Sequence, residues 1–200
     1  MKLTESFYLD SDVVSLARSF LGKTIVTNFS EGITSAYIVE TEAYAGITDR
    51  ASHAYCGRIT PRTTPMYFAG GCAYVYRCYG IHNLFNIVTG KVNVPHAVLI
   101  RAVVPEQGAD IMKHRLGIEE LSFKNSNGPG KLTKALGINN AHSGISLFGN
   151  KIWIEDRDIF VNSDDICISK RIGIDYAGDD ANLPYRFFLR ANRFKKHFGS

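Results

Sequence analysis

The residues with the clearest potential for chemistry lie between positions 38 and 44, in the segment Ile-Val-Glu-Thr-Glu-Ala-Tyr. Side chains alternate between the two faces of a β-strand, so Glu40, Glu42 and Tyr44 are predicted to share one face. If both carboxylates were desolvated there, their repulsion would raise the pKa of at least one of them. Such a group could act as a general base that orients a water molecule for attack at an anomeric carbon. The pattern also fits a solvated strand face with Tyr44 covering the core, and the spacing alone leaves both interpretations open.

A second group of aromatic side chains lies in residues 74–82, Tyr-Val-Tyr-Arg-Cys-Tyr-Gly-Ile-His. Tyr74 and Tyr76 are predicted to face the same way on a strand, whereas Tyr79 falls at a hairpin turn with Gly80 near its tip. An exposed aromatic side chain at such a tip can enter a duplex and fill the gap left by an everted base. The alternative is an aromatic stripe packed under the sheet. We favour packing for Tyr74 and the intercalating role for Tyr79.

His53 lies in a long segment, residues 45–71, that is rich in glycine and contains three arginines. A loop of this length in a compact domain is usually functional or disordered, and its aromatic and basic content argues against disorder. The side chains of Arg58, Thr60 and Arg62 suit phosphate oxygens, contacts that fix register without reading sequence. A solvated basic loop with a structural, hydrogen-bonded histidine is the alternative interpretation.

Residues 127–134, Asn-Gly-Pro-Gly-Lys-Leu-Thr-Lys, are predicted to form a glycine-rich turn that opens into a helix. Free N–H groups and the helix dipole favour an anion at that point, and Lys131 adds a positive charge. A helix start without any ligand explains the pattern as well. The segment is not a nucleotide-binding P-loop, because the GxxxxGK[ST] spacing is absent.

Several other classes of chemistry leave no trace in the sequence. It contains no Ser-His-Asp order, no HExxH, no Rossmann fingerprint and no zinc-deaminase pattern. The four cysteines show neither CxxC nor Cys/His spacing typical of zinc sites, and they are predicted to be reduced thiols. We therefore expect no metal site.

The elements that must position these residues follow from local patterns. Asp12 or Ser11 can cap a helix over residues 11–22, which ends at Gly22. Because the strands crowd together without regular intervening helices, the predicted fold class is α+β. We expect a single domain over residues 1–200, with a curved, largely antiparallel β-sheet surrounded by helices. The predicted strands are 23–29, 34–44, 72–79, 84–89 and 97–104, with short ones near Ile152, Cys167 and Phe187, and the further helices are 106–116 and 130–136.

Composition narrows the class of protein. The 200 residues are 45% hydrophobic and 21% charged, and the mean hydropathy is −0.07, which fits neither a disordered chain nor a membrane protein. The N-terminus lacks the apolar core of a secretion signal, and it meets acidic residues early. These features predict a soluble protein of the cytoplasm, with the chromosome if the cell is bacterial, or of the nucleus.

Charge is unevenly distributed along the chain. The net charge of +4 alone does not identify a nucleic-acid binder. Residues 50–105, however, contain six basic residues and no acidic one, and the last sixteen residues again carry five basic residues without an acid. Such segregation can create a positive face that attracts a polyanion, although cations scattered over the surface explain it equally well.

Taken in order, these segments resemble the alkyladenine DNA glycosylase family, the 3-methyladenine glycosylases without a helix-hairpin-helix. The resemblance covers roughly residues 12–190, and the ordered set is specific although each motif alone is not. The matching stretches are Ile38–Tyr44, Ala51–Ala54, Gly57-Arg58 with Thr60–Arg62, Tyr74–Tyr76 with Tyr79-Gly80, Asn86, Leu99–Ala102, Gly128–Leu132, and Arg171–Ile174 with Pro184–Phe187.

The resemblance implies a role for each candidate residue. Glu42 would be the general base that activates the attacking water, with Arg101 helping to hold that water. Tyr79 would be the intercalating wedge, beside Ile81 where the family commonly has methionine. The remaining residues would bind purine or DNA: Tyr44, His53 and Tyr76 would line the pocket and stack on the flipped base, Asn86 would reject the exocyclic amino group of guanine, and Arg58, Thr60, Arg62 and Lys131 would contact phosphates.

The expected activity is that of a monofunctional DNA glycosylase of base excision repair, which needs no cofactor. It would flip alkylated or deaminated purines out of double-stranded DNA and hydrolyse the N-glycosidic bond, acting as a monomer without a membrane. An alkylated purine is cationic and already a good leaving group, and tyrosine faces attract such a cation. Two alternatives are a non-catalytic binder of damaged DNA or structured RNA and a hydrolase of free nucleosides, which would have no use for the wedge. The departures at Ile81, Tyr55-Cys56 and Thr63-Thr64 leave the lesion preference open.

Overall fold

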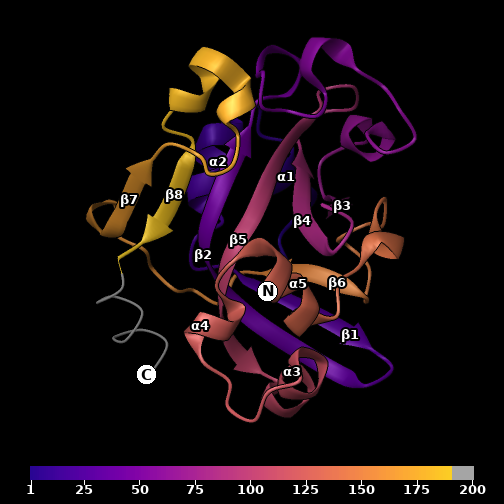
Figure 1. Cartoon of the computed structure of the whole chain (residues 1–200), viewed down its shortest axis with the longest axis vertical. Coiled ribbons are helices and arrows are strands. Elements are labelled where there is room, and N and C mark those ends of the chain that lie inside the picture. The colour runs from indigo at the N-terminus through magenta and orange to yellow at the C-terminus, as the bar shows by residue number, and fades with distance from the viewer. Residues whose placement is uncertain (191–200) are drawn as a thin grey trace.

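The computed structural model describes residues 1–190, apart from the side chain of Ser126. The basic residues Arg193, Lys195 and Lys196 of the C-terminal segment lie outside the described residues. Within them, the chain forms an antiparallel eight-stranded sheet, packed with helices around one main hydrophobic core (Figure 1). The predicted α+β class is confirmed.

The sheet has the strand order β3-β4-β5-β2-β1-β6, and β8 joins β2 to β7. The predicted strands all form, with ends that differ by a few residues. Their bounds are β1 Thr24–Phe29, β2 Gly32–Tyr44, β3 Cys72–Cys78, β4 His82–Thr89, β5 His96–Gln107, β6 Ile152–Glu155, β7 Ile166–Ser169 and β8 Arg186–Leu189.

Strand β2 is the longest strand and carries the candidate carboxylates. Its first half, residues 32–37, pairs with β1, whereas residues 40–42 pair with β8 on the same edge. The other edge pairs with β5 throughout, with register shifts around Glu40. Bulges of this kind bend a strand and increase its twist. The second half of β2 is therefore flanked by β5 and β8, and buried there.

Alternation along four neighbouring strands separates two faces of the sheet. Ala43, Val75, Phe85 and Ile100 belong to the main core. The intervening side chains face the other way, where a second, smaller cluster forms around Tyr74. Because this second face carries polar side chains between apolar ones, it is the face on which a site can form. Its members include Glu42, Tyr44, Tyr74, Tyr76, Asn86, Leu99 and Arg101.

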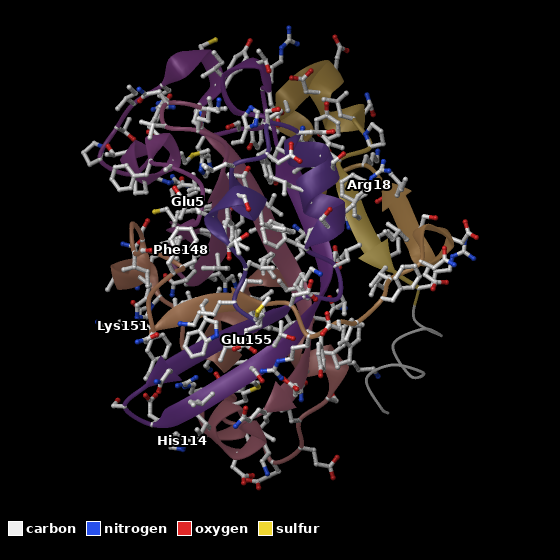
Figure 2. All side chains as sticks on the ribbon, turned by 180° about the vertical axis from the view of Figure 1, so that it is seen from behind. Glu5, Arg18, His114, Phe148, Lys151 and Glu155 are labelled. Atoms are coloured by element: carbon white, nitrogen blue, oxygen red, sulfur yellow. The ribbon has the colours of Figure 1, made fainter. Side chains whose placement is uncertain are left out.

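Helices cover the main core. Asp12 caps α2 (Val13–Ser19) by accepting hydrogen bonds from Val14 N and Ser15 N, as the sequence predicts. In the view from behind, Arg18 of α2 lies next to β8, where its guanidinium sits 4.8 Å from the ring centre of Phe187 (Figure 2). The other helices are α1 Glu5–Tyr8, α3 Ala109–Leu116, α4 Phe123–Ser126 and α5 Pro129–Leu136.

One predicted helix begins later than expected. The sequence places it from residue 106, but β5 continues through Gln107 and α3 starts at Ala109. Gly108 separates the two with φ +80°, a conformation that glycine adopts without strain. None of the helices in residues 1–190 is long and apolar enough to cross a membrane.

Two irregular segments meet at one end of the sheet. Residues 45–71 contain three short 3₁₀ turns, and the segment Asp175–Asn182 lies at the same end, yellow and purple at the top of Figure 1. They are joined by hydrogen bonds from Tyr176 Oη to Ala51 O and from Arg50 N to Asp180 Oδ2. Together they cover the polar face of the sheet.

Candidate active site

Glu42 is fully buried, with none of its side chain exposed. Its Oε2 atom accepts hydrogen bonds from Tyr44 Oη at 2.9 Å and Arg101 Nη1 at 3.3 Å, and its Oε1 accepts one from Ile172 N at 2.8 Å. Burial raises the pKa of Glu42 above its usual value, against the opposing effects of Arg101 and the other donors. The carboxyl group is thus held as a base stronger than a solvated glutamate.

Arg101 lies between two carboxylates. Its Nε donates to Glu40 Oε1 at 3.0 Å while Nη1 reaches Glu42. Glu40 Oε1 also accepts a 2.7 Å hydrogen bond from Arg186 Nε on β8. The shared strand face predicted for Glu40, Glu42 and Tyr44 is therefore present, and both carboxylates are paired rather than solvated.

An aromatic slot lies beside this network. The ring centres of His53 and Tyr76 are 4.6 Å apart at 74°, and those of Tyr74 and Tyr76 are 5.5 Å apart. The guanidinium of Arg62 sits 4.7 Å from the Tyr76 ring centre. Tyr74 is 1% exposed, so its packing role is confirmed. The slot presents flat rings to one cavity.

His53 is neutral at physiological pH. Burial, followed by the charges of Arg62 and Arg58, lowers its pKa from 6.5 to about 4. Arg62 Nη2 lies 3.2 Å from Nε2, and a guanidinium can only donate, so Nε2 is the acceptor. The ring proton therefore resides on Nδ1, which donates to Tyr74 Oη at 2.7 Å. Two hydrogen bonds fix both the tautomer and the orientation of the ring.

The cavity has a volume of about 360 Å³, within the range of small-molecule sites. The three residues that donate to Glu42 all line it, and so does Asn86. Asn86 Nδ2 donates to Tyr74 O at 3.1 Å, which leaves the amide oxygen available to a ligand. Glu42 itself does not line the cavity, but all three of its hydrogen-bond donors do. The other polar or aromatic lining side chains are Ser52, His53, Arg62, Tyr74, Tyr76, Arg77, Tyr79 and Tyr176.

The hairpin between β3 and β4 projects beside the cavity. Cys78 pairs with His82, so the turn consists of Tyr79, Gly80 and Ile81. Tyr79 has φ +50° and is 89% exposed, and Ile81 is 72% exposed. Large apolar side chains at such exposure are available to a partner.

Helix α5 supports this hairpin from one side. A Cβ atom on Gly130 would come within 2.9 Å of the His82 ring, so the two segments are in close contact. Thr133 Oγ1 donates to Asn83 O at 2.7 Å. Lys131 is exposed on the same helix, where its Nζ donates to Lys124 O at 3.0 Å. Ile81 and Lys131 therefore lie on the α5 side of the hairpin, away from the aromatic slot.

A second hollow, of about 560 Å³, adjoins the first and shares Ser52, His53, Arg62 and Tyr176 with it. Arg50, Arg58 and Thr60 also line this second hollow. The predicted cationic loop therefore borders the cavity directly.

The sequence pattern of the methylpurine-DNA glycosylase family matches residues 6–193. The chain belongs to this family. A relative from Chlamydia felis is 46% identical over 200 residues, which span 97% of this chain and 99% of the relative. Relatives from Chlamydia pneumoniae and Bacillus cytotoxicus are 45% and 42% identical, and the alignments span 94% and 97% of this chain and 94% and 98% of theirs. Each carries the provisional name 3-methyladenine DNA glycosylase.

Several residues of this methylpurine-DNA glycosylase pocket escaped the sequence reasoning. Ile172 supplies a backbone donor to Glu42 from 130 positions away. Asp49 and Arg171 form a buried ion pair beside it, and Tyr176 lines both hollows. In the sequence, Arg171 and Ile172 are marked only by their place in a motif shared with the family. That motif assigned neither residue a role. Among the described residues, no group of His, Cys, Asp and Glu side chains could hold a metal ion.

Proposed function

We propose that this chain flips alkylated or deaminated purines out of double-stranded DNA and hydrolyses their N-glycosidic bond with a water activated by Glu42. Membership in the family makes the chain an enzyme, a hydrolase of the DNA glycosylase class. The observation that carries the finer mechanism is the position of Glu42, buried at the end of an aromatic slot and touched by three residues that line the cavity.

In the proposed reaction, the everted base enters the cavity and stacks on the rings of Tyr44, His53 and Tyr76. Its sugar lies toward Glu42 and Arg101. A water molecule takes the place of the 3.3 Å Arg101 contact, the longest of the three hydrogen bonds to Glu42. Its oxygen forms a bond to C1′ while the glycosidic bond breaks, and the electron pair leaves with the base. Glu42 accepts the proton from the water. The products are a free base and an abasic site in an intact strand.

The neutral aromatic rings of the slot suit a cationic leaving group. His53 is neutral, and burial raises the pKa of Tyr76 far above neutrality, so neither ring adds a charge to the slot. Electron-rich tyrosine faces attract a cationic purine. Glu42 also stabilises the positive charge that develops on the sugar in the transition state. The site needs no protein acid for such a base.

The decisive test is base release from a panel of duplexes that carry 3-methyladenine, 7-methylguanine, hypoxanthine or ethenoadenine. Glu42→Gln is expected to lower the single-turnover release rate by about 10²–10⁴-fold, the usual contribution of a general base. Binding of the lesion duplex should persist. The matched control is Glu5→Gln, an exposed carboxylate on the opposite side of the molecule (Figure 2), which should retain the full rate.

Full release by Glu42→Gln would remove Glu42 as the base. Binding of lesion duplexes by the native chain without any base release would favour the non-catalytic alternative. Release from free nucleosides, with no salt-sensitive binding to duplex, would favour a nucleoside hydrolase.

A further inference from the structure

Arg171 is a buried arginine to which the proposed reaction assigns no role. None of its side chain is exposed, and it lies 4.8 Å from the ring centre of Tyr44 and 5.3 Å from that of Tyr185. Its Nη1 donates to Ala43 O at 2.9 Å, and its Nη2 donates to Asp180 O at 3.2 Å. A single side chain thus contacts the end of β2 and the 175–182 segment.

Asp49 completes the arrangement from the loop that covers the cavity. Both of its oxygens accept from Arg171, one of them from Nη2 at 2.9 Å. The same carboxylate accepts from Ala45 N and Ala51 N, each at 3.0 Å. Burial alone would lower the pKa of Arg171, but the ion pair with Asp49 raises it, so the arginine stays charged. A planar guanidinium paired with a carboxylate in two places has one favoured orientation.

The residue that follows this clamp is Ile172, whose N–H contacts Glu42 Oε1 at 2.8 Å. A peptide N–H can point at a buried carboxylate only while the neighbouring backbone is held in place. Arg171 fixes that backbone on one side of Ile172, and it also packs on Tyr44, the hydroxyl donor to Glu42. The clamp therefore touches two of the three groups that bind the carboxylate.

We propose that Arg171 is a positioning residue for the reaction, which through its ion pair with Asp49 holds the Ile172 N–H against Glu42. This inference rests on the proposed role of Glu42 as the base. Burial disfavours the ionised form of Glu42, whereas the N–H of Ile172 donates to that ionised form and favours it. Loss of the clamp thus makes Glu42 harder to ionise, and base release then requires a higher pH.

Other charges near Glu42 remain in place when the clamp is altered, so they set a constant background. The titratable and charged groups that face Glu42 or its pairing partner and are not altered are Glu40 and Tyr44 on β2, Arg101 on β5 and Arg186 on β8. The charge of Arg171, after β7, is the one that the Arg171 variants change or keep.

The test compares Arg171→Gln, Arg171→Lys and Ile172→Pro with the native chain on a duplex that carries cationic 7-methylguanine. Single-turnover release is measured across about pH 4 to 9. The acidic limb is read below neutral pH, where 7-methylguanine keeps its N1 proton and stays cationic, so that the ionisation of Glu42 can be followed there. Ile172→Pro deletes the N–H itself, and Ile172→Ala is its matched control because it keeps the N–H. Loss of a hydrogen bond to a charged group is expected to move the acidic limb of the pH–rate profile, in which the release rate rises as Glu42 ionises, to higher pH by about one to two units.

We expect Arg171→Gln to shift the limb as Ile172→Pro does, and Arg171→Lys to shift it less, because the positive charge remains. Ile172→Ala should leave the limb in place. The affinity for the lesion duplex should change less than the rate. An equal loss of rate at every pH in the Arg171 variants, or a shift in Ile172→Pro without one in Arg171→Lys, would overturn the proposal. If Arg171→Gln does not fold, the other two variants still decide the question.

A second measurement does not depend on activity. With ¹³C-labelled glutamate, the carboxyl resonance of Glu42 is identified by its loss in Glu42→Gln, and its titration is followed in the native chain and in Arg171→Lys. An upward shift of the midpoint in the variant supports the clamp, and an unchanged midpoint refutes it. A native chain that releases no base from any lesion would refute the proposed function instead, while this titration would still test the clamp.

Discussion

The Glu42 site and the hairpin tip lie close together but are built on opposite principles. Around Glu42, each carboxylate oxygen has a defined donor, and the supporting pair of Asp49 and Arg171 is buried. At the tip, Tyr79 and Ile81 are exposed to 89% and 72%. A reacting group gains from partners that are already oriented, because reorganisation during the reaction is then small. If the tip enters DNA, as we propose, its apolar area must instead stay uncovered until the duplex binds. Four measurements test this division between a buried, pre-oriented site and an exposed tip.

The largest effect on stability is expected from Arg171→Met. Removal of one partner from a buried ion pair leaves an uncompensated charge and costs about 3–5 kcal/mol of unfolding free energy. Urea denaturation measures this loss. Lys113→Met is the matched control, because it breaks the exposed pair between Lys113 and Asp110 and should leave the midpoint nearly unchanged. Equal effects of the two substitutions would contradict the division between buried and exposed regions.

A smaller effect is expected from pH through His53. The pKa of His53 is lowered from 6.5 to about 4 in the folded chain. At a pH between these two values, the unfolded chain therefore binds the proton more readily than the folded chain does. The stability contributed by His53 is therefore complete above about pH 6.5 and is lost as the pH falls toward 4. Between pH 7 and pH 5 the loss is about 2 kcal/mol. The stability of His53→Asn, measured at both pH values, should fall less than that of the native chain; an equal fall would show that His53 titrates normally.

Tyr79→Ala should act on binding and not on folding. Loss of an aromatic ring that stacks on bases weakens the affinity for a lesion duplex by about 1–3 kcal/mol. The denaturation midpoint should stay close to the native one, because the side chain is exposed. Tyr79→Phe keeps the ring and should retain most of the affinity. An unchanged affinity of Tyr79→Ala, measured by fluorescence anisotropy, would exclude the wedge.

The smallest effect is expected from Lys131→Ala. If Lys131 contacts a phosphate, the slope of log affinity against log salt concentration should fall by about one. The loss should be the same for damaged and undamaged duplexes, because phosphates carry no sequence information. Lys151→Ala, which removes an exposed lysine next to β6, is the control (Figure 2). Identical slopes for both variants would place Lys131 outside the DNA contact.

Local patterns predicted much of the site. Alternation on one strand placed Glu40, Glu42 and Tyr44 on a common face, and the turn residues located the hairpin tip. Residue type offered Ser11 or Asp12 as the helix cap, and the structure shows Asp12 in that role. These features depend on neighbours in sequence, so the period of a strand or the chemistry of a turn is enough to find them.

The backbone donor to Glu42 and the ion pair beside it could not be predicted in the same way. Ile172 donates through its backbone, which every residue except proline possesses, so its identity carries no signal. Asp49 and Arg171 are 122 positions apart, and each alone resembles an ordinary charged loop residue. Only the fold brings them together, and burial then turns a charge that would be solvated into an orienting contact. For Arg171 and Ile172 the sequence showed only that they belong to a motif shared with the family, and it gave no indication of what they do.

The contact between Gly130 and His82 has a mechanical consequence. If a duplex binds at the tip of the hairpin, the force on the tip presses the strand ends of the hairpin against α5, and the helix would resist backward bending. The depth that a side chain at the tip reaches in the stack would then depend on the position of this helix. A methyl group at position 130 would come within 2.9 Å of the His82 ring, so the His82 side chain or the hairpin would have to shift.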